Sequence, residues 1–126
     1  MKKRIVAALA MAAFAVGYGL HASEPATPKA YGIAEISVHD AEGYKAYVAA
    51  VTPLVEKFGG TYLVRGGRTL EKEGAPVKGR VVILEFPSLA AALAFYDSPE
   101  YQAVLPLRLK TAESRVFYVE GFAPAP

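Results

Sequence analysis

Three charged side chains in predicted strands are the residues of this chain best placed to carry out chemistry. Arg65 ends a predicted strand between two glycine pairs, in FGGTYLVRGG, and Glu35 and Glu85 lie in two other predicted strands. Because side chains alternate between the two faces of a sheet, we expect all three on the face away from the helices. Two close carboxylates raise the pKa of one of them, which suits general acid–base catalysis. A guanidinium can also bind the carboxylate of a small ligand through two parallel hydrogen bonds.

The same three residues allow a purely structural interpretation. Burying an unpaired charge is costly, so we expect Arg65 to pair with Glu35 or Glu85 whether or not the site is functional. A satisfied ion pair, or solvated charges at the mouth of a barrel, would then account for them. The sequence leaves these interpretations open.

His39 and several tyrosines are the remaining candidates. His39 follows the first predicted strand, where it is either a base at the rim of a pocket or a solvated junction residue. Four tyrosines recur at helical spacing, and they either line a cleft between helix and sheet or pack in the core: Tyr44, Tyr47, Tyr96 and Tyr101. Of these four, Tyr44 and Tyr96 are the candidate ligand contacts.

The pattern of apolar residues predicts the elements that position these side chains. Strands are expected over residues 31–38, 61–65, 80–86 and 114–121. One helix is expected after the N-cap Asp40, with a kink or split at Pro53, and two more after Ser88 and Ser98. The order β-α-β-β-α-β predicts an α+β, ferredoxin-like fold, with a four-stranded antiparallel sheet and its helices on one face. The bare face would expose a large apolar patch, which a second copy could cover to form a dimeric α+β barrel.

The same pattern assigns the remaining side chains to faces. The sheet residues expected to face the helices are Ala34, Ile36 and Val38. The helix residues expected to point toward the sheet are Leu89, Ala92, Leu93, Tyr96 and Leu109. The residues expected on the opposite face of the sheet are Leu63, Val116, Tyr118 and Glu120, together with the three charged candidates. Arg108 and Arg115 are expected on solvated surfaces or at the rim of a dimer.

The N-terminus resembles an export signal. Lys2, Lys3 and Arg4 precede the apolar run Ile5–Leu20, which is shorter than the roughly 20 residues that span a bilayer comfortably. We therefore expect a signal peptide over 1–22, a linker over 23–30, the folded domain over 31–122 and a short tail over 123–126. The expected location is the periplasm or the outside of the cell; an uncleaved membrane anchor is the alternative, and the only contact with a membrane that we expect.

Composition excludes several classes of function. The chain has no cysteine, so disulfides and thiolate chemistry are absent. Cleavage after residue 22 would leave 11 basic against 12 acidic residues, and this balance argues against nucleic-acid binding. One histidine would remain, which excludes a multi-histidine metal site.

The chain resembles the family catalogued as domain of unknown function 1330, in the dimeric α+β barrel superfamily. The resemblance rests on YGIAEISVHDAEGYKAYV, FGGTYLVRGG, RVVILEFPSLAAALAFYDSPEYQAV and SRVFYVEG, and it covers residues 31–122. It implies a ferredoxin-like homodimer and names no activity. Haem enzymes of the superfamily are a poor match, because the chain lacks tryptophan and has one histidine beyond the signal.

These observations predict an exported homodimer that binds a small molecule in a cleft of the barrel, without a cofactor or metal. One alternative is a cofactor-independent monooxygenase or isomerase that uses Glu35, Glu85 or His39 for proton transfer. Another is a structural dimer without a ligand.

Overall fold

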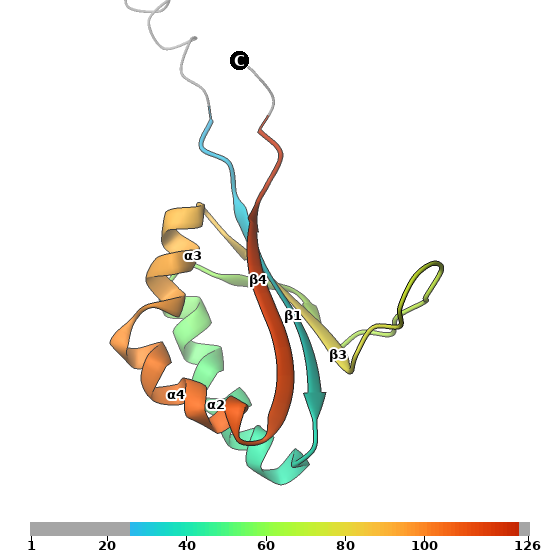
Figure 1. The fold of residues 1–126 in the computed structure, drawn as a ribbon. Coiled ribbons are helices and arrows are strands. Elements are labelled where there is room, and N and C mark those ends of the chain that lie inside the picture. The colour runs from blue at the N-terminus through green and yellow to red at the C-terminus, as the bar shows by residue number, and fades with distance from the viewer. Residues whose placement is uncertain (1–25, 124–126) are drawn as a thin grey trace, which may run out of the picture. The chain divides into compact units, whose positions relative to one another are not determined.

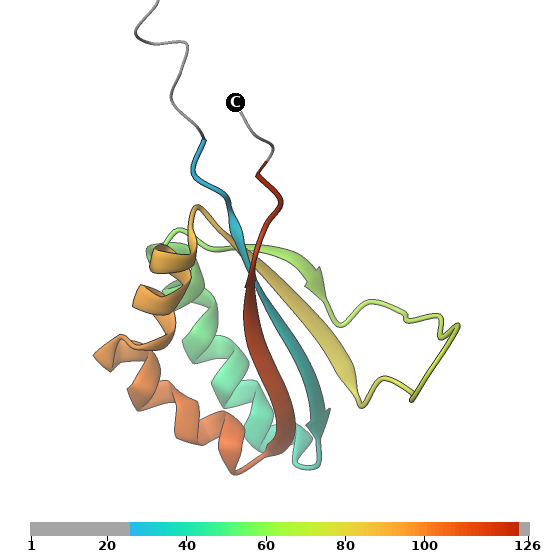
Figure 2. The same ribbon diagram turned by 45° about the horizontal axis from the view of Figure 1, so that its top comes forward.

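A four-stranded antiparallel sheet with helices on one face forms the folded part of the chain (Figures 1 and 2). The computed structural model describes residues 26–123. The elements run in the order β1 Ala30–Val38, α2 Ala41–Lys57, β2 Thr61–Arg65, β3 Arg80–Phe86, α3 Leu89–Tyr96, α4 Pro99–Leu109 and β4 Ala112–Glu120. The strand order β2-β3-β1-β4 places β1 and β3 in the centre. The α+β, ferredoxin-like prediction is thus confirmed, and the predicted export signal lies outside the described residues.

Local signals in the sequence set the helix ends. The side chains of Asp40, Ser88 and Ser98 each accept a hydrogen bond from a backbone N–H of the first turn that follows. At the far end of α2, Gly59 adopts a positive φ of 82°, a conformation that favours glycine. Pro53 was expected to kink or split this helix, yet α2 continues unbroken to Lys57.

The hydrophobic core lies between the helices and the inner face of the sheet. Its most buried members include Phe86 from β3, Val55 from α2 and Phe95 from α3. Phe86 and Phe95 stack with ring centroids 5.4 Å apart. As predicted, Ile36 faces the helices and is buried. Leu93, by contrast, is exposed, because the buried face of α3 runs through Ala92 and Phe95.

The side chains of β4 point to the opposite faces of the sheet from those expected. Val116 pairs with Ala34 of β1, and Tyr118 pairs with Gly32. Since directly opposed residues share a face, Val116 and Tyr118 point toward the helices, and the prediction that they point away was wrong. The face without helices instead carries the exposed side chain of Phe117.

Strand β2 contains an irregularity that reverses the orientation of its end. Tyr62 pairs with Leu84 and Val64 pairs with Ile83, so one extra residue lies between the two pairs. Such a bulge interrupts the alternation of side chains. Both Tyr62 and Arg65 consequently lie on the helix side, while Leu63 is exposed.

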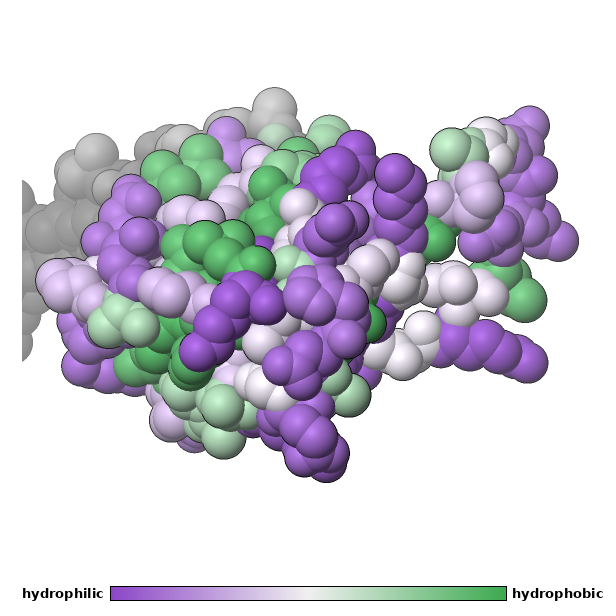
Figure 3. Space-filling view, turned by 60° about the horizontal axis from the view of Figure 1, so that its bottom comes forward, coloured by the Kyte–Doolittle hydropathy of each residue, from purple (hydrophilic) through white to green (hydrophobic). Residues whose placement is uncertain are grey.

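A long loop, residues 66–79, joins β2 to β3 and projects away from the sheet (Figures 1 and 2). Its surface is mostly hydrophilic, as the right side of Figure 3 shows. Hydrogen bonds hold both ends of the loop: the backbone N–H of Gly66 donates to the carbonyl of Val81, and that of Lys78 donates to the carboxylate of Glu35. Among residues 26–123, no helix has the length and apolar character needed to cross a membrane.

Candidate binding site

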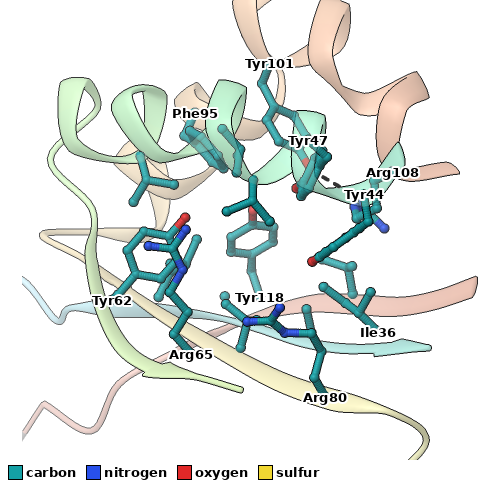
Figure 4. Close-up of a pocket in the computed structure, with 18 residues that line it drawn as sticks. Ile36, Tyr44, Tyr47, Tyr62, Arg65, Arg80, Phe95, Tyr101, Arg108 and Tyr118 are labelled. Atoms are coloured by element: carbon teal, nitrogen blue, oxygen red, sulfur yellow. Dashed lines mark hydrogen bonds between the residues drawn. The ribbon is translucent and has the colours of Figure 1, made fainter. Parts of the chain in front are cut away.

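A small cavity of about 60 Å³ lies between α2 and the inner face of the sheet (Figure 4). Its walls are mainly aliphatic and aromatic. The polar groups that line it are five tyrosines and three arginines: Tyr44, Tyr47, Tyr62, Tyr101, Tyr118, Arg65, Arg80 and Arg108. No aspartate, glutamate or histidine is among the described residues that line the cavity.

The tyrosines reach the cavity from opposite layers. Tyr44 and Tyr47 are buried on α2, and the Tyr47 hydroxyl shares a hydrogen bond of 2.9 Å with the Tyr101 hydroxyl of α4. Tyr118 comes from the sheet, and its ring lies against Gly32 of β1. A Cβ at position 32 would come within 2.7 Å of this ring, so the absence of a side chain there makes room for Tyr118.

Burial raises the pKa of three of these tyrosines. Removal from water raises the pKa of Tyr47, and the neighbouring Tyr101 raises it further. Burial likewise raises the pKa of Tyr118. The pKa of Tyr44 is also raised by burial, although the nearby guanidiniums of Arg80, Arg108 and Arg65 oppose this effect. At neutral pH the cavity therefore presents neutral hydroxyl groups, which can donate hydrogen bonds but are poor bases.

Three guanidiniums from three different elements face the cavity. Arg108 of α4 is only 3% exposed; it donates to the Ser114 hydroxyl over 2.6 Å and, more weakly, to the Tyr101 hydroxyl over 3.4 Å. Arg80 begins β3, and its buried Nε has no hydrogen-bond partner within residues 26–123. Arg65 ends β2, at the exposed mouth, where it stacks on Tyr62 and donates to the Thr52 hydroxyl of α2 over 2.7 Å. Among the described residues, none of the three has a carboxylate oxygen within 4.0 Å.

Arg65 does not meet either glutamate, so its predicted ion pair was wrong. The bulge in β2 turns Arg65 to the helix side, whereas Glu35 and Glu85 lie on the opposite face. The two glutamates are also far from each other. Glu85 pairs with Tyr31, four residues before Glu35 on β1, and this offset corresponds to about 13 Å along the strand.

Each glutamate has a different basic partner. Glu85 pairs with Lys29 over 3.3 Å. Glu35 pairs with Arg115 over 2.8 Å and lies in a separate groove of about 460 Å³, beneath the end of the β2–β3 loop. The backbone N–H of Lys78 and the guanidinium of Arg115 lower the pKa of Glu35. Glu35 is therefore ionised at neutral pH and lacks the raised pKa of a general acid.

The other candidates are divided between the cavity and its surroundings. Tyr44 lines the cavity, as Arg65 does. Tyr96 lies outside it and packs against Tyr101, with ring centroids 5.1 Å apart. His39 lies on the surface, and its backbone N–H donates to the carbonyl of Thr111. The structure thus brings together two of the predicted ligand contacts and none of the predicted proton-transfer groups.

Sequence reasoning missed Arg80, Arg108 and Tyr118. Arg108 was expected on the surface, but it follows Tyr101 by seven residues, so the two share the inward face of α4. That spacing could have found it. Leu109, which was expected to point inward, is exposed instead. The inward position of Tyr118 depends on the pairing of β4 with β1, which no local pattern reveals.

The fold is shared with solved structures that define its class, the ferredoxin-like α+β proteins. A protein of unknown function from Rhodopseudomonas palustris, RPA0582, is 23% identical over 86% of this chain and 93% of its own, with a TM-score of 0.63. SnoaB, described as a cofactor-independent oxygenase from Streptomyces nogalater, is 15% identical over 79% of this chain and 99% of its own, with a TM-score of 0.56. A dimeric ferredoxin-like protein of unknown function from Thermobifida fusca is 12% identical over 75% and 92%, with a TM-score of 0.50.

The family itself is established by sequence. Residues 29–122 match the model of the domain of unknown function DUF1330, so the chain belongs to that family. The resemblance noted from the sequence motifs is thereby confirmed. A search among curated proteins found no match.

Proposed function

We propose that this protein binds a small molecule in the cavity between α2 and the sheet. The observation that carries the proposal is the cavity lining, in which aliphatic walls meet five tyrosines and three arginines on the inner side of the sheet. Ligand sites usually combine apolar walls with a few polar groups of this kind. The volume of about 60 Å³ is well below the roughly 300–1,000 Å³ of sites for drug-sized ligands. The ligand is therefore small, or it inserts one end while the remainder lies at the mouth beside Arg65.

A pair of matched variants tests this proposal. Val48→Phe would place a larger side chain in the cavity, while Val38→Phe makes the same change at the exposed end of β1, outside the cavity. Ligand-observed NMR with a mixture of small aromatic and aliphatic compounds would detect binding to the wild-type chain. We expect Val48→Phe to lose the signals and Val38→Phe to keep them. Equal binding by both variants, with the fold intact by circular dichroism, would place the ligand elsewhere.

The enzyme alternative has less support. Cofactor-independent oxygen chemistry is the description of SnoaB, a protein that shares the fold at 15% identity. In this chain, however, Glu35, Glu85 and His39 do not line the cavity. Burial raises the pKa of three tyrosines that do line it, Tyr44, Tyr47 and Tyr118, so these three are not ready bases.

We further propose that two copies pair through the bare face of the sheet. Phe117 and Val119 of β4 and Leu63 of β2 are exposed, at 42%, 45% and 51%. An apolar face of this kind, without a covering layer among the described residues, is typical of an interface. Light scattering should find a dimer of the wild-type chain and a monomer of Phe117→Glu. Phe122→Glu, at the exposed end of the described chain, is the matched control and should remain dimeric; a wild-type monomer at micromolar concentration would exclude this pairing.

Export is the last part of the proposal, and its support is the basic and apolar N-terminal sequence alone. Cell fractionation followed by intact-mass measurement would test it. A chain that begins near Ser23 in the exported fraction supports cleavage. A full-length chain in the membrane fraction would indicate the uncleaved anchor instead.

A further inference from the structure

We infer that the molecule bound in this cavity carries a carboxylate and that Arg80 holds it. This inference rests on the proposed function and names the chemical class of its ligand. It commits to a small monocarboxylate with a short aliphatic or aromatic body. Four features of the site support it, and they concern charge, geometry, hydrogen bonding and size.

The charges around the cavity are unbalanced. Three guanidiniums line it, and no carboxylate does so among the described residues. Three carboxylates that adjoin cavity residues in the sequence are engaged elsewhere, since Glu35 pairs with Arg115, Glu85 with Lys29 and Glu100 with Lys57. Removing positive charge from water is costly without a counter-charge, so the cavity favours an anion.

The side chain of Arg80 lies at the cavity wall. Its guanidinium lies against Gly66, where an added Cβ would come within 2.9 Å of Nη2. On another side it lies 5.8 Å from the ring centre of Tyr44. Figure 4 shows the side chain extending from β3 into the cavity, toward the aromatic residues. Because the guanidinium is planar, it loses less freedom for each hydrogen bond that it forms than an ammonium group would.

Arg80 also has an unused hydrogen-bond donor. Its Nε is buried and has no partner among the described residues, although buried polar groups in proteins are nearly always paired. Arg108 uses the Ser114 hydroxyl, and Arg65 uses the Thr52 hydroxyl, so each of these two has at least one protein partner. Of the three guanidiniums, Arg80 therefore has the fewest hydrogen-bond partners among the described residues. A carboxylate can accept hydrogen bonds from its Nε and a terminal nitrogen together.

The dimensions and walls of the cavity favour a carboxylate over a phosphate. A carboxylate is planar and carries one charge, whereas a phosphate is tetrahedral and more strongly hydrated. The space of about 60 Å³ has mainly apolar walls, which cannot replace the water that a dianion loses. Tyr44, whose ring centre lies 5.8 Å from the Arg80 guanidinium, carries a hydroxyl that can serve as a second donor for a carboxylate oxygen.

The test compares acids with their uncharged amides. Acetate, isobutyrate and benzoate, each beside its amide, would be titrated into the wild-type chain by calorimetry or ligand-observed NMR. We expect the acid to bind at least about tenfold more tightly than its amide, as the loss of charge-assisted hydrogen bonds predicts. Arg80→Gln should abolish this preference. Arg68→Gln is the matched control, because it removes the same charge from the exposed loop, away from the cavity.

Each outcome is decisive. Equal binding of acid and amide to the wild-type chain would overturn the inference and leave the proposed function standing. Binding by none of the six compounds would also overturn the inference, and the compound mixture tested with Val48→Phe and Val38→Phe would then decide the proposed function. Inorganic phosphate that binds more tightly than every acid would overturn the carboxylate class. If Arg80→Gln does not fold, Arg80→Lys is the substitute, because it keeps the charge and lacks Nε. An unchanged preference for acid over amide in that variant would refute the role given to Nε and the terminal nitrogen of Arg80.

Discussion

Replacing Arg108 by methionine should make the protein more stable. Arg108 is 3% exposed, and its guanidinium has no carboxylate partner among the described residues. Methionine keeps most of the apolar stem, fills irregular space and carries no charge. The change therefore removes a buried charge while preserving the packing around it.

The structure allows the size of the effect to be worked out. The variant loses the 2.6 Å hydrogen bond to Ser114, and a bond to a charged group contributes about 1.5–3 kcal/mol. The contact with Tyr101 is long, at 3.4 Å, and contributes little. Against this loss stands the burial of one ion, which costs several kcal/mol. We expect the free energy of unfolding to rise by about 1–3 kcal/mol, which raises Tm by at least about 4 °C in a domain of this size.

The assay is urea and thermal unfolding of wild type, Arg108→Met and Arg108→Lys. The buffer must contain neither carboxylate nor phosphate, because an anion bound to the wild-type chain would stabilise it and mask the difference. Arg108→Lys is the control; it keeps the charge and loses the planar fork, and it should be less stable than wild type. A decrease of more than about 1 kcal/mol in Arg108→Met would refute the reasoning, since it would mean that the protein already satisfies this guanidinium.

Three further predictions concern other parts of the structure. The pKa of Glu35 is lowered by the Lys78 N–H and by Arg115, so its stabilising effect is present above the unfolded pKa and is lost as pH falls below about 4.5; urea midpoints of wild type and Glu35→Gln should differ at neutral pH and converge in acid. The pKa of Tyr118 is raised by burial, so its stabilising effect is present below the unfolded pKa and is lost as pH rises above about 10. The urea midpoint of Tyr118→Phe should therefore fall less steeply with rising pH than that of wild type, and parallel slopes would contradict the burial argument. Gly79 has a φ of 79°, and a Cβ there would collide with the backbone of β1; Gly79→Ala should lose at least about 2 kcal/mol in urea unfolding, and an unchanged midpoint would show that this backbone moves freely.

The fold was predictable because its signals are local. The bounds of β2 and β3 follow from short runs of strand-forming residues between glycines and prolines. The caps at Asp40, Ser88 and Ser98 follow from side chains that accept backbone hydrogen bonds. Each of these signals acts within a few residues of the element that it sets.

The site was less predictable because its geometry depends on pairing between strands. The bulge in β2 inserts one residue and moves Arg65 to the other face, and no feature of FGGTYLVRGG specifies it. The phase of β4 likewise depends on which residue of β1 faces Tyr118. Arg108 is a different case, because it lies on the apolar face of α4 and its charge led to the wrong assignment.

The contact between Gly32 and the ring of Tyr118 controls how much of the cavity stays open. The ring occupies the space where a methyl group at position 32 would be, so the smallest possible side chain there would push it toward α2. In other members of the DUF1330 family, the residue at this position should therefore report whether the cavity is open or filled. A family alignment sorted by that one position would separate chains able to hold a ligand from chains whose interior is solid.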